Sequence, residues 1–308
     1  MTRHLLPVTR HRTLALIGAN GMLAQAVTEA APDDYAIVPL DLPEFDMTDA
    51  GFVDEVLGRI KPDVIVNCAA YTNVDGCETE EALATKVNGD GPGNLARTAK
   101  ALDATLVHIS TDYVFSGLKT SPYTEEDMTD PQSGYGRSKL AGETAILESG
   151  LEKFFIIRTS WLYGPGGNNF VETILRLAKQ REELHIVADQ VGSPTFTHDL
   201  ANALFGLLDL TRHPSPVTRH CLYGIYHFSN NGQCNWYEFA QEIVAQAQQF
   251  GESVKVQRVL PIRTEDYPLP ATRPAYSVFS REKYMRATGV QVPDWRSSLS
   301  TYFKLREG

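Results

Sequence analysis

The sequence predicts an α/β protein with a doubly wound parallel sheet of the Rossmann type and a smaller C-terminal lobe that binds substrate. Short apolar runs alternate with helical patterns as far as residue 160, which is the order of a parallel sheet covered by crossover helices. A glycine turn joins the first run to the first helix, and proline-rich segments replace the alternation after residue 160. We therefore expect a dinucleotide-binding domain at 13–160, to which later segments return, and a mainly substrate-binding lobe at 161–308.

The first elements follow from apolar runs, helical periodicity and turn residues. Residues 13–31 (TLALIGANGMLAQAVTEAA) predict a strand, a turn and a helix, because the apolar run is short and continuous, as in a strand buried on both faces. Pro62 ends the next amphipathic pattern, since proline disrupts a helix interior. This interpretation gives strands at 35–41 and 63–70 and a helix at 50–62.

The alternation continues to residue 160 and then loosens. A long helical pattern at 77–102 contains the letters GDGPG, which predict an irregularity inside it. A helix beginning near Tyr135 is expected between two further strands, and Asn235 is expected to cap a helix in the C-terminal half. The remaining expected elements are strands at 105–110 and 153–160, helices at 135–149, 168–180 and 235–250, and proline-rich segments at 213–217 and 266–274.

Composition narrows the class of protein. Of the 308 residues, 43% are apolar and 21% are charged, as in an ordinary globular protein. The net charge of -10 argues against a general nucleic-acid binder. No apolar run approaches a membrane span, and the basic start MTRHLLPVTRHR lacks the apolar stretch of a signal peptide. We expect a cytoplasmic protein without nucleic-acid or membrane partners.

The cysteines do not predict a metal site. The sequence contains four, at positions 68, 77, 221 and 234, and none has the spacing of a zinc-binding pair. We interpret them as reduced thiols and expect no bound metal. Cys68 is expected to be a small residue near the cofactor and not a nucleophile.

The glycine turn predicts a dinucleotide site. Gly18, Gly21 and Ala24 follow a strand and open a helix, the context in which this spacing signals phosphate binding. Gly18 would make the tight turn, Gly21 would let the helix N-terminus approach a pyrophosphate, and Ala24 would keep the helix close to the sheet. Asn20, Met22 and Leu23 would complete the cofactor contacts. A plain strand-to-helix turn is the alternative.

An acid at the end of the second strand bears on the choice of cofactor. Asp41 lies 23 residues after Gly18, where dinucleotide folds use a carboxylate to accept hydrogen bonds from the adenosine ribose. It would repel a 2′-phosphate and therefore favours NADH, whereas a solvated strand-end acid is the alternative. Asp46 and Met47 would flank the adenine.

The predicted catalytic residues are Thr111, Tyr135 and Lys139. Tyr135 and Lys139 are four residues apart, so one turn of helix brings them to the same face. A free tyrosine has a pKa of about 10, and a nearby ammonium brings it toward neutral pH and makes the phenol an acid–base group. Lys139 would also hold the nicotinamide ribose, Thr111 would bind the substrate oxygen, and Ser110 would lie beside the cofactor.

Eight stretches along most of the chain carry a family resemblance. They are GANGMLA, PDVIVNCAAYTNVDGCE, STDYVFSG, YGRSKLAGE, RTSWLYG, ADQVGSPT, YHFSNNGQCNWYEFAQEI and RPAYSVFSREK. With them the chain resembles the extended short-chain dehydrogenase/reductases, and more closely the dTDP-4-dehydrorhamnose reductase family. The resemblance implies reduction of the C4 ketone of dTDP-4-dehydro-L-rhamnose by NADH or NADPH, with Tyr135 as proton donor and Thr111 and Lys139 beside it.

The resemblance also implies the remaining site residues. The loop from Ala69 to Val74 would face cofactor and sugar, and Trp161 and the helix start at 168–169 would lie in the substrate lobe. The implied cofactor contacts are Cys68, Ala69, Ala70 and Tyr71, and the implied substrate contacts are Thr72, Val74, Asp112, Tyr113, Trp161, Asn168, Asn169 and Arg273.

Several of these residues have plain structural alternatives. Trp161 could be core between the lobes, and Arg273, whose guanidinium suits a diphosphate, could be an exposed loop residue. His108 inside a strand is expected to be a satisfied core histidine and not a base. Trp236, Tyr237 and Phe239 are expected to pack their helix.

One departure from the family pattern concerns metal. Magnesium-using members carry a glutamate soon after the glycine turn that binds the ion at a dimer interface, and this chain has Ala26 there. We therefore expect no need for magnesium, with Glu29 as the nearest acid that could replace the missing carboxylate. Monomer and homodimer both remain open.

Two other functions remain alternatives. One is a different extended-type nucleotide-sugar epimerase or reductase. The other is a non-catalytic dinucleotide-binding regulatory subunit like the methionine adenosyltransferase beta subunit, against which the intact Tyr135–Lys139 pair argues.

Overall fold

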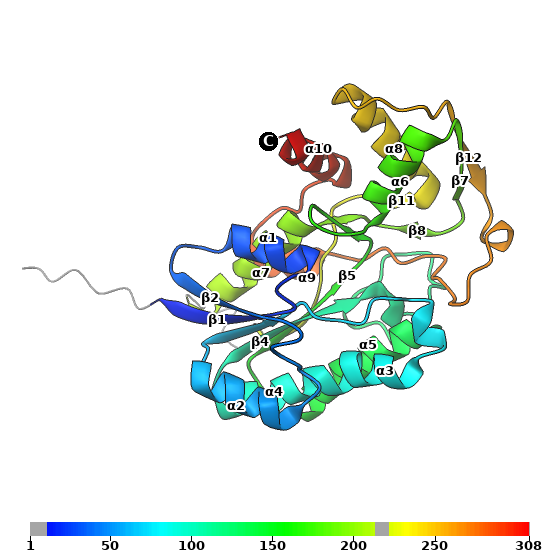
Figure 1. Cartoon of the computed structure of the whole chain (residues 1–308). Coiled ribbons are helices and arrows are strands. Elements are labelled where there is room, and N and C mark those ends of the chain that lie inside the picture. Colours follow the sequence, from blue (N-terminus) through cyan, green and yellow to red (C-terminus); the bar gives the residue numbers. More distant parts are fainter. Residues whose placement is uncertain (1–10, 213–221, 308) are drawn as a thin grey trace, which may run out of the picture.

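The computed structural model describes residues 11–212 and 222–307. The basic start, Cys221 and the proline-rich segment 213–217 lie outside these residues. The centre is a six-stranded parallel sheet with the order β10-β5-β4-β3-β1-β2 (Figure 1). The predicted α/β class with a parallel sheet is thus confirmed. Its strands are β1 (Arg12–Ile17), β2 (Tyr35–Leu40), β3 (Val64–Asn67), β4 (Thr105–Thr111), β5 (Phe154–Thr159) and β10 (Gly224–His227).

Helices cover both faces of the sheet (Figure 1). Alternate residues of β1 point to opposite sides, so Leu14 and Leu16 join one core cluster and Ala15 and Ile17 join another. One face is covered by α1 (Met22–Ala30), α7 (Thr197–Leu210) and α9 (Glu282–Thr288), and the other by α2 (Ala50–Ile60), α3 (Glu81–Thr85), α4 (Gly91–Ala101) and α5 (Gly134–Glu148).

The irregularity predicted within 77–102 is a π-helix, η2 (Lys86–Asp90), between α3 and α4. Pro92, in the first turn of α4, lacks the N–H that a regular helix would donate to Asn88 four residues earlier. The Asn88 side chain accepts from the Tyr71 amide at 2.8 Å and donates to the Tyr71 carbonyl at 3.0 Å. The π-helix therefore holds the loop that follows β3.

The C-terminal lobe has its own core, formed by α6 (Phe170–Gln180), α8 (Trp236–Gln249) and α10 (Trp295–Glu307). The predicted Asn235 cap is confirmed, because Asn235 and Glu238 form a capping box at the start of α8. Trp236 and Phe239 pack in this lobe as expected. Short strand pairs complete it: β6 (Leu162–Tyr163) with β9 (Thr195–Phe196), β7 (Glu183–Val187) with β12 (Arg258–Ile262), and β8 (Val191–Gly192) with β11 (Cys234–Asn235).

The sheet has a topological switch point between β1 and β3, because β2 lies on one side of β1 and β3 on the other. The Cys68 amide donates to the Ile17 carbonyl at 3.0 Å, so the two strands end together. Ligands of open α/β sheets bind at the carboxyl ends of strands at such a point. This geometry locates the candidate site.

Candidate functional site

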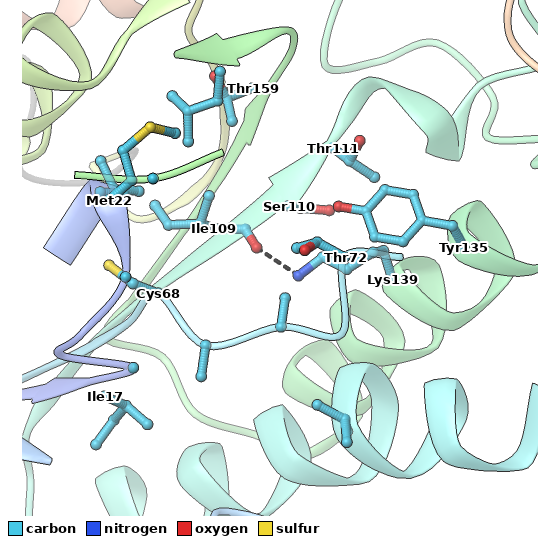
Figure 2. A pocket seen from close by; sticks show the side chains of 18 of the residues that line it. Ile17, Met22, Cys68, Thr72, Ile109, Ser110, Thr111, Tyr135, Lys139 and Thr159 are labelled. Carbon is cyan, nitrogen blue, oxygen red and sulfur yellow. Dashed lines mark hydrogen bonds between the residues drawn. The ribbon is translucent and has the colours of Figure 1, made fainter. Parts of the chain in front are cut away.

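A cavity of about 910 Å³ lies at the switch point, between the sheet and the C-terminal lobe (Figure 2). Segments from both parts of the chain line it, and most of the predicted site residues are among them. These are Gly18, Asn20, Gly21, Met22, Leu23, Asp41, Asp46, Met47, Cys68, Ala69, Ala70, Thr72, Val74, Ser110, Thr111, Asp112, Tyr113, Tyr135, Lys139, Trp161 and Asn168.

Three predicted site residues lie outside the lining. The Tyr71 hydroxyl binds Glu80. Asn169 caps α6 by accepting from the Glu172 amide at 3.1 Å. Arg273 forms a two-pronged ion pair with Asp75, with nitrogen–oxygen distances of 2.7 and 2.8 Å. The side chains of Asn169 and Arg273 therefore have structural partners here, and their role in binding stays a prediction.

The cavity also has walls that the sequence analysis missed. Gly166 and Gly167 pack against the start of α1, where Cβ atoms at these positions would meet Gln25 and Met22. The letters GPGGNN were a usable signal for this close approach, whereas the other missed residues carry no local signal. Those others are Ile17, Leu42, Phe45, Thr48, Val87, Ile109, Thr159, Ser160, Leu162 and Phe170.

The glycine turn, residues 18–23, is a backbone cradle. Gly18 has a φ of +76°, and a Cβ there would lie 2.7 Å from the amide nitrogen of Ala69. Gly21 precedes α1 with no side-chain cap, and the first turn of that helix carries no acid. The free amides at a helix N-terminus attract phosphate oxygens. The turn therefore fits the pyrophosphate of a dinucleotide.

Asp41 is anchored to this cradle. One carboxylate oxygen accepts from the Asn20 amide and the other from the Leu42 amide, each at 2.8 Å. Each oxygen can accept further hydrogen bonds, so the carboxylate is available to ribose hydroxyls. Its role in cofactor choice stays a prediction.

The predicted catalytic residues Thr111, Tyr135 and Lys139 line one part of the cavity, which we call the catalytic corner. Ser133 caps α5 by accepting from the Gly136 amide at 3.1 Å, which places Tyr135 in the first turn and Lys139 one turn later. The Tyr135 ring points to the end of β4, where Ser110 and Thr111 lie (Figure 2). Lys139 is only 2% exposed and donates to the Ile109 carbonyl at 2.7 Å.

The electrostatics suit a proton donor. Burial raises the pKa of Tyr135, as does the Asp112 carboxylate, while a hydrogen bond with Thr111 opposes them. The phenol therefore holds its proton at neutral pH. Burial lowers the pKa of Lys139 to about 8, and it raises the pKa of Asp112 to about 6.

Ser110 and Cys68 are two other residues predicted to contact the cofactor. The Ser110 hydroxyl donates to Glu143 at 2.5 Å, and Glu143 forms a buried ion pair with Arg158 at 2.6 Å. Cys68 is at the cavity wall, where burial raises the pKa of its thiol to about 12. The prediction that Cys68 is no nucleophile agrees with this, because the reactive thiolate is suppressed.

Trp161 serves both purposes that the sequence left open. It lines the cavity, and it stacks on Trp236 of the lobe core with ring centroids 3.5 Å apart. Its φ of +47° is uncommon for a residue other than glycine. Gly192 allows the ring to approach the backbone, because a Cβ there would lie 2.5 Å from the indole.

Ala26 and Glu29, the two positions that bear on magnesium binding, lie in different environments. Ala26 is 2% exposed in the core between α1 and α7. Glu29 instead points outward and pairs with His198 at 2.7 Å, so the two residues do not share an environment. Among the described residues, no group of three or more His, Cys, Asp or Glu side chains could hold a metal ion.

Two further expectations concern single features of the chain. His108 is confirmed as a satisfied core histidine, with both ring nitrogens close to polar side chains. Within residues 11–212 and 222–307, no helix has the length and apolar character to span a membrane.

Comparison with known proteins gives a consistent family. A family model described as the RmlD substrate binding domain matches residues 12–307. A dTDP-4-dehydrorhamnose reductase from Burkholderia thailandensis is 41% identical over 92% of this chain and 95% of its own length. A probable dTDP-4,6-dihydroxy-2-methyloxan-3-one 4-ketoreductase from Streptomyces antibioticus is 38% identical over 94% of this chain and 93% of its own.

A solved structure agrees with these relatives. The crystal structure of dTDP-4-dehydrorhamnose reductase from Bacillus anthracis in complex with NADP superposes with a TM-score of 0.86 at 41% identity. It covers 96% of this chain and 99% of that chain. The chain belongs to the dTDP-4-dehydrorhamnose reductase family.

Proposed function

We propose that the protein is an NAD(P)H-dependent reductase that converts dTDP-4-dehydro-L-rhamnose to dTDP-L-rhamnose. One observation carries the proposal: a tyrosine and a buried lysine share one cavity with a glycine turn that leads into an uncapped helix N-terminus. Proton donor and dinucleotide site are thus brought together where a ketone can be reduced.

The residues fit a bound dinucleotide. Gly18 and Gly21 allow the tight turn that leads into the uncapped N-terminus of α1, where a pyrophosphate can bind, and Asp41 can accept from a ribose. When bound, the reduced nicotinamide supplies the hydride. Lys139, one helical turn after Tyr135 in the catalytic corner, can hold a ribose hydroxyl.

Tyr135 acts as general acid in this proposal. As negative charge develops on the C4 oxygen, the phenol transfers its proton to that oxygen. The Thr111 hydroxyl, which donates to Asp112 Oδ1 at 3.0 Å in the structure, can turn to the same oxygen. Burial lowers the pKa of Lys139 to about 8, so below that pH its ammonium stabilises the phenolate that remains.

Residues from both parts of the chain line the part of the cavity that we propose binds the substrate. Thr72 and Val74 come from the loop after β3, and Trp161 and Asn168 come from the segment that leads into the lobe. We propose the division into a dinucleotide domain at 13–160 and a mainly substrate-binding lobe at 161–308. In support, α7, β10 and α9 return to the sheet while α6, α8 and α10 form a separate core.

The test is an assay with dTDP-4-dehydro-L-rhamnose and each dinucleotide, followed by identification of the sugar product. We expect oxidation of NADH or NADPH only when the ketosugar is present, and dTDP-L-rhamnose as product. Oxidation with a different product would favour another 4-ketosugar, a possibility kept open by the 4-ketoreductase relative. Dinucleotide binding with no turnover of any dTDP-4-ketosugar would favour a non-catalytic binding protein.

A further inference from the structure

Lys139 of the catalytic corner is the last of three buried polar residues that lie in a row. The proposed mechanism gives the three residues no joint role. Asn67 ends β3, His108 is its register partner on β4, and Lys139 comes from α5. Their exposures are 1%, 1% and 2%. Asn67 Nδ2 lies 3.1 Å from His108 Nδ1, and His108 Nε2 lies 3.3 Å from Lys139 Nζ.

The direction of the first hydrogen bond is set by the backbone. The Ala69 amide donates to Asn67 Oδ1 at 3.0 Å, and a backbone N–H can only donate. The other end of the carboxamide, the donor Nδ2, must therefore face His108. Nδ1 of His108 consequently accepts, and a neutral imidazole with that arrangement carries its proton on Nε2.

The second contact then constrains the lysine. The Nε2–H group is a donor, and an ammonium has three donors and no acceptor. With a charged lysine, either tautomer of His108 leaves one donor facing another donor, and an imidazolium does the same. A neutral amine resolves the conflict, because its lone pair accepts from His108 while one N–H donates to the Ile109 carbonyl at 2.7 Å.

We propose that Asn67 and His108 are positioning residues for Lys139, which orient its amine and favour its uncharged form. The inference rests on the proposed function only for the catalytic importance of Lys139. The two residues act through Lys139, since neither lines the cavity. They would make Lys139 a group that changes charge near neutral pH instead of a permanent cation.

The other groups around Lys139 are compatible with an uncharged amine. From α5, Glu143 favours the charged form, but its carboxylate is paired with Arg158, and Tyr135 is a neutral phenol. From the loop after β3, Cys68 is a protonated thiol, because burial raises its pKa to about 12.

The neighbouring π-helix adds no charge to this environment. Asn88 is the buried residue that it directs to α5, where it donates to Ser138 at 3.0 Å. The charged residues of η2, Lys86 and Asp90, are exposed. Burial lowers the pKa of Lys139 to about 8, and burial together with Lys139 holds the pKa of His108 well below its ordinary value.

The test is side-chain NMR of the full chain labelled with ¹⁵N in histidine and with ¹³C and ¹⁵N in lysine. His108→Phe and Lys139→Met serve to assign the signals. In the wild type we expect Lys139 to titrate near pH 8, and His108 to stay neutral from pH 6 to 9 and to carry its proton on Nε2 at pH 9, where Lys139 is uncharged. A proton on Nδ1 of His108 at pH 9, or a Lys139 that stays charged above pH 10, would overturn the proposal without any variant.

We call the hydrogen-bonded row from Asn67 through His108 to Lys139 the relay. Asn67→Asp reverses the direction of its hydrogen bonds with almost no change in side-chain shape. A carboxylate at this position still accepts from Ala69, but it also accepts from His108 Nδ1–H, so Nε2 becomes an acceptor for an ammonium. We expect the titration of Lys139 to rise by about one pH unit or more. Comparison of His108→Phe with the double variant Asn67→Asp/His108→Phe is the control, because the added charge then acts only through space.

The outcomes are separable from those of the proposed function. The relay is refuted if Asn67→Asp leaves the Lys139 titration unchanged, or if the shift is equally large without the imidazole. These measurements need no sugar and no turnover. A relay that titrates as expected in a protein that reduces no ketosugar would leave the relay standing and refute the function.

Discussion

The glycine turn and the catalytic corner occupy the same cavity but use different atoms of the chain. At the turn, Gly18 and Gly21 carry no side chain, and the N-terminus of α1 that follows them has no side-chain cap. At the corner, Tyr135 and Lys139 bring ionisable side chains into a buried environment that shifts their pKa values. The comparison teaches that the proposed binding at the turn should depend on shape, whereas the proposed chemistry at the corner should depend on protonation.

Removal of the Tyr135 hydroxyl should have the largest effect on turnover while leaving dinucleotide binding at the turn intact. Tyr135→Phe deletes the proton donor and keeps the ring that packs against Tyr113, with centroids 5.5 Å apart. We expect turnover to fall by about 10²–10⁴-fold, the usual contribution of a general acid, with dinucleotide affinity almost unchanged. Steady-state kinetics and dinucleotide titration check this, and activity within about threefold of wild type would show that another group donates the proton.

The buried carboxyl of the corner should make stability depend on pH. The pKa of Asp112 is raised from 3.8 to about 6, so the folded state holds its proton at pH values where the unfolded state has lost it. Stability from this group is present below pH 4 and is lost as the pH rises through 6. Relative to wild type, Asp112→Asn should therefore gain up to about 3 kcal/mol of unfolding free energy between pH 4 and pH 7.

Denaturant unfolding at both pH values measures this gain. Asp33→Asn, at an exposed carboxyl before β2, is the control and should show little pH-dependent difference from wild type. An Asp112→Asn curve parallel to wild type across this range would mean that the buried carboxyl does not titrate as its environment indicates.

The glycine turn should respond to shape alone. In Gly18→Ala the new Cβ would lie 2.7 Å from the Ala69 nitrogen, at a φ of +76°. We expect a loss of about 1–3 kcal/mol in stability and at least about tenfold weaker dinucleotide binding. Gly58→Ala is the matched control, because nothing lies within 4 Å of its added Cβ in α2; it should be neutral or stabilising by up to about 1 kcal/mol. Equal effects of the two changes would contradict the cradle.

How well each region could be predicted follows from how local its contacts are. The glycine turn is contiguous, and Tyr135 and Lys139 are one helical turn apart, so both are visible in the sequence. The stack of Trp161 on Trp236 and the ion pair of Asp75 with Arg273 join distant segments. No periodicity reports such pairs, and the arginine was therefore expected free to bind substrate.

Elements of the fold were likewise predictable only where the signal lies within a short stretch of sequence. The strands and helices that were predicted lie close to their observed bounds, whereas α7, α9 and α10 were not predicted. The sixth strand, β10, was not predicted: it has four residues like β3, but its letters GIYH contain no continuous apolar run such as the VIV of β3. The relay from Asn67 through His108 to Lys139 depends on the pairing of β3 with β4, and strand pairing has no signature within either strand.

Asp41 lies at the turn but acts through a side chain, so its loss should have a smaller effect. Asp41→Ala removes an acceptor of ribose hydroxyls, and we expect about 3–10-fold weaker NADH binding, the value of one hydrogen bond. NADPH should lose less, because the repulsion of its 2′-phosphate disappears as well. Asp41→Asn is the control that removes the charge and keeps an acceptor. Wild-type protein that bound NADPH more than tenfold tighter than NADH would contradict this role.

Magnesium should have the smallest effect of all, because neither region offers it a site. Magnesium binds through carboxylates and water in near-octahedral geometry, and the chain has a buried alanine, Ala26, where metal-using relatives would have an acid. Glu29 lies almost one helical turn further on, but it is exposed and already paired with His198 at 2.7 Å. We therefore expect EDTA treatment to change neither the activity nor the size of the protein in solution, with Glu29→Gln behaving like wild type. A loss of activity or of a dimer on chelation that magnesium restores in the wild type, and not in Glu29→Gln, would refute the prediction and identify Glu29 as the replacement ligand.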